Sequence, residues 1–456
     1  MIEFKACHEV ALAEWKIEER KHGMLYEEAR VYLDHVSKYG SVLGLDSIKG
    51  LLNKLGNPQQ DLTFIQIAGT NGKGSILCYL SEILTNSGCV TGRYSSPAVM
   101  DELETIQVNG VSISKEEMGR LTETVKEASE LLVKEGRPAP TLFETETAVA
   151  LLYFKERLCD IVILETGLGG GLDATNVVEN TILDVFAPIG MDHMAILGNT
   201  IEEIAGAKAG IIKSRATVVT APQKETVLAV LKDRAEEKNC PVHETKAEEI
   251  KIKKTGLSGQ VFSYRQFEDL KINMAGKYQT ENAATAIEAA LALREKGFDI
   301  EDQAICRGLA NARWRGRFDM ISENPLIILD GAHNIEAAKR LSENVNDYLN
   351  DKKITAVIGI FKDKEYKKII QIMAPYITAA YPVELPNEDR TLSKEDLIRE
   401  LQEYPLEIRD VNSIEEAVKQ AVQACGENEA VLIFGSLSHL GKVKALVDGG
   451  ADNYGR

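Results

Sequence analysis

The chain has 456 residues, of which 44% are hydrophobic and 27% are charged, and its formal net charge is −17. The length predicts two domains, and no apolar run reaches the roughly 20 residues needed to cross a bilayer. The negative charge argues against a nucleic-acid partner, since phosphate backbones are bound by clustered lysines and arginines.

The seven cysteines are scattered and form no CxxC pair, which is typical of free thiols and not of a disulfide framework or a zinc site. The first residues lack the apolar segment and the cleavage site of a signal peptide. We therefore expect a cytoplasmic protein.

Short β-branched runs alternate with helical patterns along the chain, which predicts an α/β fold with parallel sheets covered by helices on both faces. The predicted strands are residues 64–68, 161–164, 183–187, 218–220, 327–329, 356–360 and 431–434. Ligands in such folds bind beyond the carboxyl ends of the strands. Unusual polar sequences stand at those ends, at residues 69–75, 165–167, 192–193 and 330–334.

The first of these sequences, GTNGKGS at residues 69–75, lies between a predicted strand and an amphipathic helix over residues 76–86. Its glycines allow backbone N–H groups to converge on phosphate oxygens, and the helix N-terminus favours negative charge. Lys73 can neutralise the β- and γ-phosphates, and Ser75 can bind phosphate or a metal ion. Gly74 separates lysine from serine, so the run differs from GxxxxGK[ST]. A plain glycine-rich turn is the alternative, but the strand–loop–helix context favours phosphate binding.

Glu165 directly follows a predicted strand, and His193 stands beside Asp192 after another. Either residue alone is usually structural. One carboxylate, one imidazole and a hydroxyl near a phosphate loop can form a Mg²⁺ site around ATP.

Lys208 lies on the apolar face of a predicted helix. Thr200 and Glu203 form a capping box that starts this helix, and apolar residues follow at helical spacing. Burial would lower the pKa of the lysine and favour the neutral amine. The pattern alone slightly favours the other interpretation, an apolar stem whose ammonium reaches water.

A domain boundary is predicted at the basic segment RWRGR, residues 313–317, which follows helices over residues 281–294 and about 301–311. The expected domains are residues 1–311 and 316–456. Asp330 would follow the first strand of the second domain, where a carboxylate suits a ribose hydroxyl or a metal-bound water. An ordinary helix-capping residue is the alternative.

Seven motifs in order resemble the folylpolyglutamate synthase/dihydrofolate synthase family of the Mur ligase superfamily, over nearly the whole chain after about residue 25. They are IAGTNGKGS (67–75), YSSP (94–97), ETGLGGGLDATN (165–176), DHMAILGNTIEEIAGAKAGIIK (192–213), NAATA (282–286), WRGR (314–317) and LDGAHN (329–334). The resemblance implies a P-loop Mur-ligase-type domain followed by a smaller Rossmann-like C-terminal domain, with ATP between them. It also implies that a carboxylate is phosphorylated to an acyl phosphate, from which the amino group of glutamate displaces phosphate.

The resemblance also implies roles for individual residues. Contacts to ATP are expected from Thr70, Asn71, Gly72, Lys73, Gly74, Ser75, Asn282, Arg317 and Asp330. Ligands to one or two Mg²⁺ ions are expected from Ser96, Glu165, His193 and Lys208, the last as an N6-carboxylated lysine. Catalytic roles fall to Lys73, Lys208 and His193. The site of the pterin-bearing substrate is expected to include Val42, Leu43, Gly44, Leu45, Thr141, Phe143, Leu172, Asp173 and Ala174.

Five positions depart from the family pattern. Ala98 replaces the histidine usual after SSP, and Thr105 replaces the arginine of ERIxxNG. The others are Ala207 for a glutamate before the lysine, Tyr278 for a histidine before Gln279, and Arg315 for a proline before Gly316. The departures leave the expected ATP and metal positions intact, and the changes at Ala98 and Thr105 bear on the details of substrate recognition.

We therefore expect a monomeric ATP-dependent ligase that joins L-glutamate to dihydropteroate, to a tetrahydrofolate, or to both. Its partners are expected to be small molecules, with neither nucleic acid nor membrane among them. The alternatives are a Mur-type ligase with another acceptor, and a nucleotide-binding regulator without catalytic activity.

Overall fold

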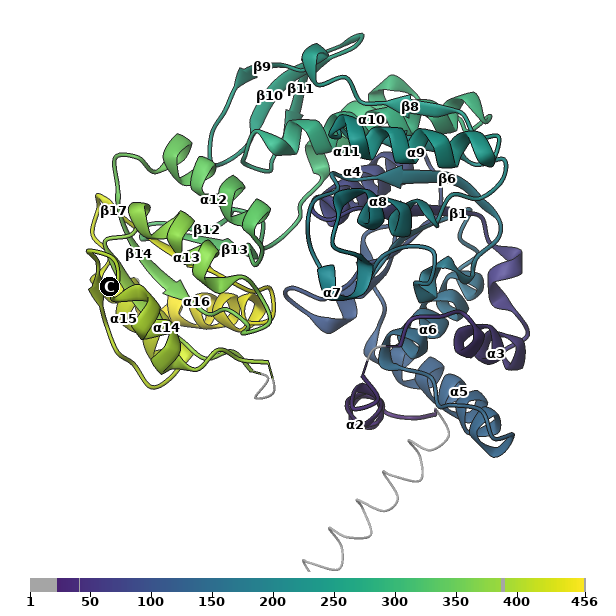
Figure 1. The fold of residues 1–456 in the computed structure, drawn as a ribbon, viewed down its shortest axis with the longest axis horizontal. Coiled ribbons are helices and arrows are strands. Elements are labelled where there is room, and N and C mark those ends of the chain that lie inside the picture. Colours follow the sequence, from purple (N-terminus) through teal and green to yellow (C-terminus); the bar gives the residue numbers. More distant parts are fainter. Residues whose placement is uncertain (1–22, 41, 387–389, 455–456) are drawn as a thin grey trace, which may run out of the picture.

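The structure, a computed structural model, describes residues 23–40, 42–386 and 390–454. Two α/β lobes, each built on its own large sheet, lie side by side, with the first lobe on the right of Figure 1 and the second on the left. This arrangement confirms the predicted fold class. The boundary predicted between residues 311 and 316 remains a proposal; it falls between α11 (Asp302–Asn311) and β12 (Asp319–Glu323).

The first lobe contains an eight-stranded sheet with the order β4-β3-β2-β5-β1-β6-β7-β8. Its strands are β1 (Phe64–Ala68), β2 (Thr91–Tyr94), β3 (Ile106–Val108), β4 (Val111–Ser112), β5 (Ile161–Glu165), β6 (Thr181–Phe186), β7 (Thr217–Thr220) and β8 (Val242–Glu244). The sheet is parallel, as expected, from β2 to β8, whereas β3 and β4 at its edge are antiparallel to their neighbours. Asn109 and Gly110, both with positive φ, form the two-residue turn between β3 and β4. Asn-Gly is the sequence signal for such a hairpin.

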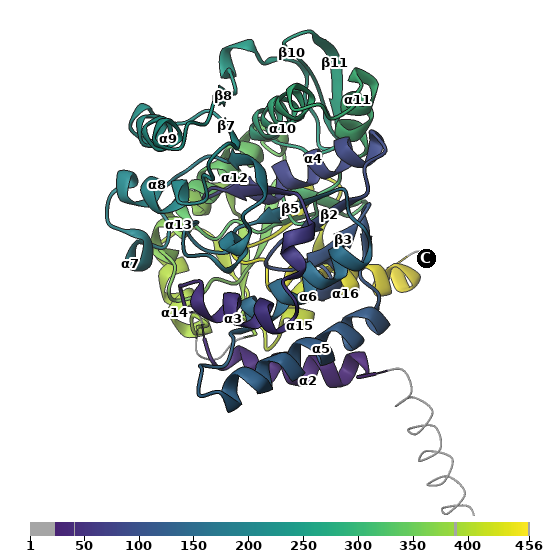
Figure 2. The same cartoon turned by 90° about the vertical axis from the view of Figure 1, so that its right-hand side faces the viewer.

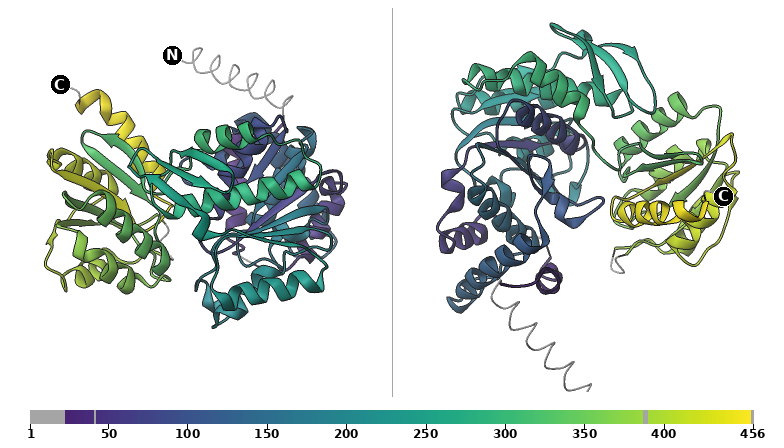
Figure 3. Two further views of the ribbon diagram at one scale, coloured as in Figure 1. Left: turned by 90° about the horizontal axis from the view of Figure 1, so that it is seen from above. Right: turned by 180° about the vertical axis from the view of Figure 1, so that it is seen from behind.

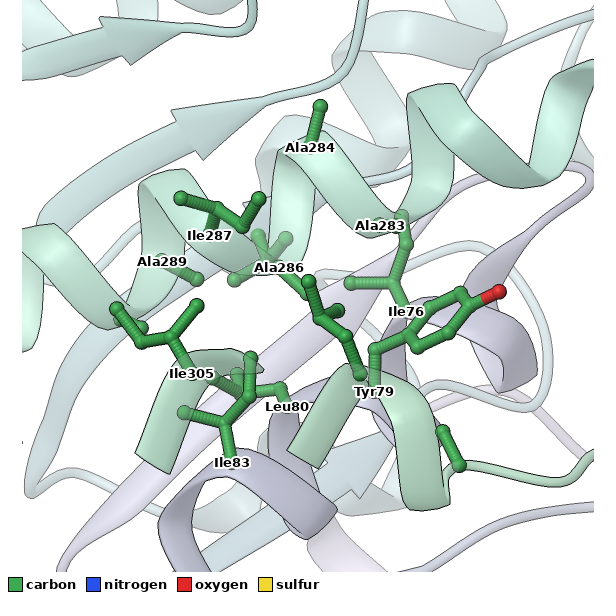
Figure 4. Packing of buried hydrophobic residues seen from close by; sticks show 14 of the residues in the cluster. Ile76, Tyr79, Leu80, Ile83, Ala283, Ala284, Ala286, Ile287, Ala289 and Ile305 are labelled. Carbon is green, nitrogen blue, oxygen red and sulfur yellow. The ribbon is translucent and has the colours of Figure 1, made fainter. Parts of the chain in front are cut away.

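Alternating residues of the central strands pack into two different hydrophobic cores, one on each face of the sheet. Ile65 and Ile67 of β1 face a cluster with α4 (Lys73–Asn86), α10 (Tyr278–Glu295) and α11, whereas Phe64 faces the opposite cluster. Figure 4 shows the contact of α4 with α10 and α11, where small alanines of α10 let the helices approach closely. Because both faces of the sheet are buried, successive residues of a strand must be apolar. The strands therefore appear in the sequence as continuous apolar runs and not as alternating patterns.

The opposite face of the sheet is covered mainly by α3, α5 and α6, which lie below it in Figure 2, with α4, α10 and α11 above. Helices α8 and α9 pack on β6 and β7. The bounds of these helices are α2 (Tyr26–Ser37), α3 (Asp46–Lys54), α5 (Lys115–Lys134), α6 (Leu142–Glu156), α7 (Met194–Leu197), α8 (Ile201–Ala209) and α9 (Glu225–Glu237).

The second lobe contains a six-stranded sheet with the order β12-β13-β17-β14-β15-β16. Its further strands are β13 (Leu326–Asp330), β14 (Lys353–Ile358), β15 (Ala379–Pro382), β16 (Glu407–Ile408) and β17 (Glu429–Phe434), and its helices are α12 (Ile335–Tyr348), α13 (Tyr366–Met373), α14 (Lys394–Leu401), α15 (Ile414–Ala424) and α16 (Leu440–Tyr454). β12 is antiparallel to β13 and precedes it. The strand that ends at Asp330 is therefore the second strand of this lobe, whereas the sequence analysis predicted that it would be the first.

A three-stranded antiparallel sheet lies beside α11 and reaches toward the second lobe, as Figures 1 and 3 show. It comprises β9 (Lys251–Lys254), β10 (Gln260–Tyr264) and β11 (Phe267–Ile272). Its edge strand β9 is exposed along its length and rich in lysine, so it carries no apolar pattern by which it could be predicted. Lysines on an edge strand also oppose pairing with other chains. In the part of the chain that the structure describes, no helix is both long and apolar enough to span a bilayer.

The contact between α4 and α11 requires a glycine at position 308. A Cβ there would lie 2.5 Å from both the backbone nitrogen and the Cα of Ile83. We expect Gly308→Ala to destabilise the first lobe by about 1–3 kcal/mol, as overpacking in a rigid core does. Gly206→Ala is the matched control, because a Cβ on Gly206 in α8 meets nothing within 4 Å. The control should be neutral or stabilising by up to about 1 kcal/mol. Denaturant unfolding of the two variants measures this, and equal midpoints would contradict the packing argument.

Candidate functional site

The phosphate loop, residues 69–75, joins the end of β1 to the start of α4. Gly72 is the N-cap of α4 and has φ +94°, a conformation that favours glycine. A Cβ on Gly74 would lie 2.5 Å from Cζ2 of Trp314. Gly74, the residue that departs from the usual motif, is therefore required by the packing of the indole on the loop.

Lys73 begins α4 and turns its side chain back along the loop. Its Nζ donates to the carbonyl oxygens of Gly69 at 3.3 Å and Thr70 at 3.5 Å, and lies 3.8 Å from Oε1 of Glu165. Ser75 is buried, and its Oγ accepts a hydrogen bond from Nε2 of Gln279 at 3.2 Å. The loop thus presents backbone N–H groups and one lysine at a helix N-terminus, which is the arrangement that binds phosphate.

Glu165 is the last residue of β5, and His193 is the N-cap of α7. Burial raises the pKa of Glu165, although Lys73 and Arg317 oppose that shift. Burial lowers the pKa of His193, so its imidazole is neutral and able to bind a metal ion at neutral pH. Both residues and Ser96 line the same cleft. Within the described ranges no group of three or more His, Cys, Asp or Glu side chains is arranged to hold a metal ion.

Lys208 lies on α8 with only 5% of its surface exposed. The capping box of this helix is formed as the sequence predicts: Oγ1 of Thr200 accepts from the Glu203 N–H, and Oε2 of Glu203 accepts from the Thr200 N–H, both at 3.2 Å. Nζ of Lys208 donates to the carbonyl oxygen of Gly69 at 2.8 Å. Burial, reinforced by the charge of Lys73, lowers the pKa of Lys208 to about 7. A substantial fraction of this side chain is therefore a neutral amine at physiological pH.

Asp330, the last residue of β13, faces the loop from the second lobe. Its two carboxylate oxygens accept hydrogen bonds from the N–H groups of Phe318 and Ala332, both at 2.7 Å. Burial raises the pKa of Asp330 to about 6, although Arg317 opposes that shift. Asn282 lies on α10 in the first lobe, and its Oδ1 is buried without a hydrogen-bond partner among the described residues. That oxygen is available to a donor on a bound ligand.

The two lobes touch at the edge of the cleft. The side chains of Asn71 and Asn334 contact each other at 3.3–3.4 Å, and Nδ2 of Asn334 donates to Oδ2 of Asp192 at 3.0 Å. Nζ of Lys364 lies 3.5 Å from Oδ1 of Asp192. Burial alone would raise the pKa of Asp192, but Lys364, His193 and Asn334 together lower it. Sequence reasoning missed Lys364, which lies in no recognisable motif.

Every residue predicted to contact ATP or Mg²⁺ lines one cleft between the lobes. These residues are Thr70, Asn71, Gly72, Lys73, Gly74, Ser75, Ser96, Glu165, His193, Lys208, Asn282, Arg317 and Asp330. His333, in the motif LDGAHN, also lines the cleft, and sequence reasoning missed it. Burial lowers the pKa of His333 to about 4, so it is neutral.

The residues predicted for the pterin-bearing substrate are more dispersed. A second cleft adjoins the first, and Ser96 and Pro97 line both. Among the described residues of the predicted substrate set, Phe143 alone lines either cleft, and it lines the second. The side chain of Thr141 caps α6, and Asp173 accepts hydrogen bonds from the Leu168 and Thr175 N–H groups and the Thr175 hydroxyl.

The remaining predicted substrate positions lie around one contact. The Gly44 N–H donates to the carbonyl oxygen of Leu172 at 3.1 Å, which brings the 42–45 segment to Leu172. Val42, Leu43 and Leu172 are exposed, whereas Ala174 is buried. Leu45 is partly buried and is the N-cap of α3.

Two family models match this chain. The Mur ligase middle domain matches residues 67–290, and the Mur ligase glutamate ligase domain matches residues 316–437.

Relatives match the chain along nearly its whole length. It is 36% identical to the dihydrofolate synthase/folylpolyglutamate synthase of Bacillus subtilis, over 92% of this chain and 98% of that one. The crystal structure of a folylpolyglutamate synthase from Thermotoga maritima is 34% identical and superposes with a TM-score of 0.81, over 93% of this chain and 97% of that one. A bifunctional folylpolyglutamate synthase/dihydrofolate synthase with bound Mn, AMPPNP and L-glutamate is 28% identical, with a TM-score of 0.79, over 94% and 99% of the two chains.

The position of Lys73 predicts that it contributes to nucleotide affinity. We expect Lys73→Ala to raise the Kd for ATP about tenfold or more, which corresponds to about 1.4 kcal/mol, because one cation beside the phosphates is lost. Lys253→Ala is the matched control, since Lys253 also pairs with carboxylates but lies on β9, outside the cleft. Titration calorimetry gives both constants, and circular dichroism checks the fold. Unchanged affinity in Lys73→Ala would refute the phosphate site.

Proposed function

This chain belongs to the folylpolyglutamate synthase/dihydrofolate synthase family of the Mur ligase superfamily, and we propose that its cleft is the site where ATP drives the joining of L-glutamate to the carboxylate of a folate. One observation carries the assignment: residues of both lobes that the family pattern places around ATP meet in a single cleft. ADP and phosphate are the other products.

The chemistry requires an activated acyl group, because a carboxylate is a poor acylating agent. In the proposed reaction the folate carboxylate attacks the γ-phosphorus of ATP, ADP leaves, and an acyl phosphate forms. The amino group of glutamate then attacks the acyl carbon, and phosphate leaves as the amide bond forms. The phosphate loop and Lys73 hold the nucleotide and neutralise the charge that builds on the transferred phosphoryl group.

Glu165, His193 and Ser96 fit a divalent cation as a partial ligand set. They supply one carboxylate, one neutral imidazole and one hydroxyl at the cleft wall beside the phosphate loop. A bound Mg²⁺ would neutralise phosphate charge and orient the γ-phosphoryl group. The remaining ligand positions of the Mg²⁺ ion would be filled by ATP and by a second anionic group.

We propose that this second group is a carbamate on Lys208. A neutral amine attacks the carbon of CO₂, and loss of one proton from nitrogen leaves an anionic carbamate. The burial of Lys208 and its lowered pKa favour the amine that this reaction needs. The carbamate would carry a negative charge where a lysine ammonium would carry a positive one. Its two oxygens would therefore suit a site for a metal ion.

The choice of acceptor also belongs to this proposal. We propose that dihydropteroate and tetrahydrofolate both enter the site, as the double name of the Bacillus subtilis relative suggests. A cytoplasmic location and a monomeric state remain predictions from the sequence.

ADP release by the purified protein tests the function. We expect release that requires ATP, Mg²⁺ and L-glutamate together with dihydropteroate or tetrahydrofolate, and no release when EDTA removes the metal. A coupled ADP assay and mass spectrometry of the glutamylated product measure it. Release with another acceptor but with neither folate would favour a different Mur-type ligase, and ATP binding without any release would favour a regulator.

The carbamate makes a separate prediction about Lys208. Lys208→Ala should lose activity, and acetate or formate should partly restore it by occupying the vacated anion position. Lys208→Arg should not be rescued, because its fixed charge fills the space and repels the metal. The wild-type protein should also show a carbamate carbon signal by NMR in isotopically labelled bicarbonate.

Lys213→Ala is the matched control for the rescue. Lys213 is also a partly buried lysine with a lowered pKa, but it donates to the carbonyl oxygen of Asn176 and does not line the cleft. Acetate should leave this variant unchanged. Full activity of Lys208→Ala would overturn the carbamate proposal.

A further inference from the structure

Arg93 is a buried cation that the proposed reaction does not use. It lies on β2, and only 9% of its surface is exposed. Its Nη1 donates to Oγ of Ser81 on α4 at 3.4 Å. Among the described residues it forms no ion pair, and its Nε is buried without a hydrogen-bond partner. A buried charge with so few partners is unfavourable unless another group stabilises it.

The group that lies against Arg93 is the indole of Trp314. Cζ of Arg93 is 5.4 Å from the centroid of the Trp314 ring, which is within the range of a cation–π contact. The face of the ring attracts the positive charge, and this attraction is stronger where water is excluded. The indole therefore compensates in part for the missing carboxylate, and Arg93 in turn restrains the position of the ring.

The indole is also in close contact with the phosphate loop. An added Cβ on Gly74 would lie 2.5 Å from Cζ2, 2.7 Å from Cε2 and 2.9 Å from Nε1 of Trp314. Among the described residues Nε1 has no hydrogen-bond partner. No hydrogen bond from the indole therefore fixes the ring on the loop, and its position depends on packing and on the contact with Arg93.

The segment that carries Trp314 leads from the loop into the nucleotide cleft. Sγ of Cys78 on α4 donates to the carbonyl oxygen of Arg313, one residue before Trp314, at 3.2 Å. Arg317, three residues after Trp314, lines the cleft, whereas Arg93 and Trp314 do not. An effect of Arg93 or Trp314 on nucleotide binding must therefore pass through the phosphate loop or through Arg317.

We propose that Arg93 is a positioning residue for ATP: its guanidinium group holds the Trp314 ring against Gly74, and the ring holds the phosphate loop and Arg317 in their binding positions. The inference deepens the proposed function, because it takes the cleft to bind ATP. The alternative is that Arg93 only stabilises the first lobe. Its replacement would then lower the free energy of unfolding and leave the ATP affinity of the folded protein unchanged.

Arg93→Met tests the proposal, because it removes the charge and keeps a long, flexible side chain. We expect the Kd for ATP to rise about fivefold, measured by titration calorimetry at a temperature where the variant is folded. Arg157→Met is the matched control, because Arg157 also lies over an aromatic ring, that of Tyr153 at 5.1 Å, but is exposed and lines neither cleft. It should leave the Kd unchanged.

The fluorescence of Trp314 supplies a readout that a merely stabilising role would not change. The only other tryptophan of the chain is Trp15, which lies outside the described residues. Trp15→Phe therefore leaves Trp314 as the only indole, and this variant is the reference. In that background, without nucleotide, Arg93→Met should increase the quenching of Trp314 by acrylamide, because a ring released from Gly74 is more accessible to the quencher.

A double-mutant cycle shows whether the two residues act together. Trp314→Leu should itself raise the Kd for ATP, because it removes the ring from the loop. In the Trp314→Leu background, Arg93→Met should change the Kd by less than about twofold, since no ring remains for the guanidinium group to hold. Two changes that multiply as independent effects would overturn the proposal.

An unchanged Kd for ATP in Arg93→Met would also overturn it, as would unaltered quenching of Trp314 in that variant. If Arg93→Met does not fold, Trp314→Leu decides, and an unchanged Kd there refutes the proposal. In each of these cases the wild-type protein binds ATP, so the inference fails alone. A wild-type protein that binds no ATP would refute the proposed function, and this inference with it.

Discussion

Close packing around the phosphate loop is the constraint on which both lobes depend. Three of its glycines approach three different segments: an added Cβ would lie 2.6 Å from Cβ of Ala187 at Gly69, 2.7 Å from Oδ1 of Asn282 at Gly72, and 2.5 Å from the Trp314 ring at Gly74. Trp314 belongs to the segment that leads into the second lobe. The loop therefore fixes the positions of α10 and of the interlobe segment at the same time as it forms an anion site, and a side chain at any of these glycines would disturb both.

The charges of the cleft follow from the same packing. Lys73 and Lys208 both donate to the carbonyl oxygen of Gly69, so two amines share one buried acceptor. Lys73 keeps access to the cleft, whereas Lys208 is enclosed, and its pKa falls because burial and the neighbouring charge of Lys73 act together. Burial also raises the pKa of Glu165, which lies beside Lys73, and of Asp330, which faces the loop from the second lobe. Lys208 and Asp330, with pKa values of about 7 and about 6, thus titrate near neutrality, as is common where ligands or metals bind.

The sequence predicted those parts of the molecule in which local pattern and tertiary position agree. The capping box of Thr200 and Glu203 placed Lys208 on the buried face of α8, since helix phase depends only on spacing. The strands before Gly69, Glu165 and Asp330 were found because sheets buried on both faces give short continuous apolar runs. β9 was missed because its lysines leave no such run, and β3 was missed although Asn109 and Gly110 mark its turn. Lys364 was out of reach for a different reason: its contact with Asp192 joins positions far apart in the chain, and no local pattern encodes it.

Two of the five departures from the family pattern, Ala98 and Thr105, line a second cleft beside the nucleotide cleft, and Tyr278 lines the nucleotide cleft itself. Glu146 also lines the second cleft, where the family resemblance leads us to expect a histidine at position 98 and an arginine at position 105. The second cleft therefore lacks the imidazole and the guanidinium group that the family pattern predicts, and it contains the carboxyl group of Glu146. Arg30 lies on the same cleft and is paired with Glu102 and Asp34, and it only partly offsets the rise that burial causes in the pKa of Glu146. The nucleotide cleft keeps its loop, its lysines and its metal-ligand candidates, because the chemistry of phosphoryl transfer is the same for every acceptor. We infer that sequence differences in the neighbouring cleft change which acceptor is bound and leave the way it is activated unchanged.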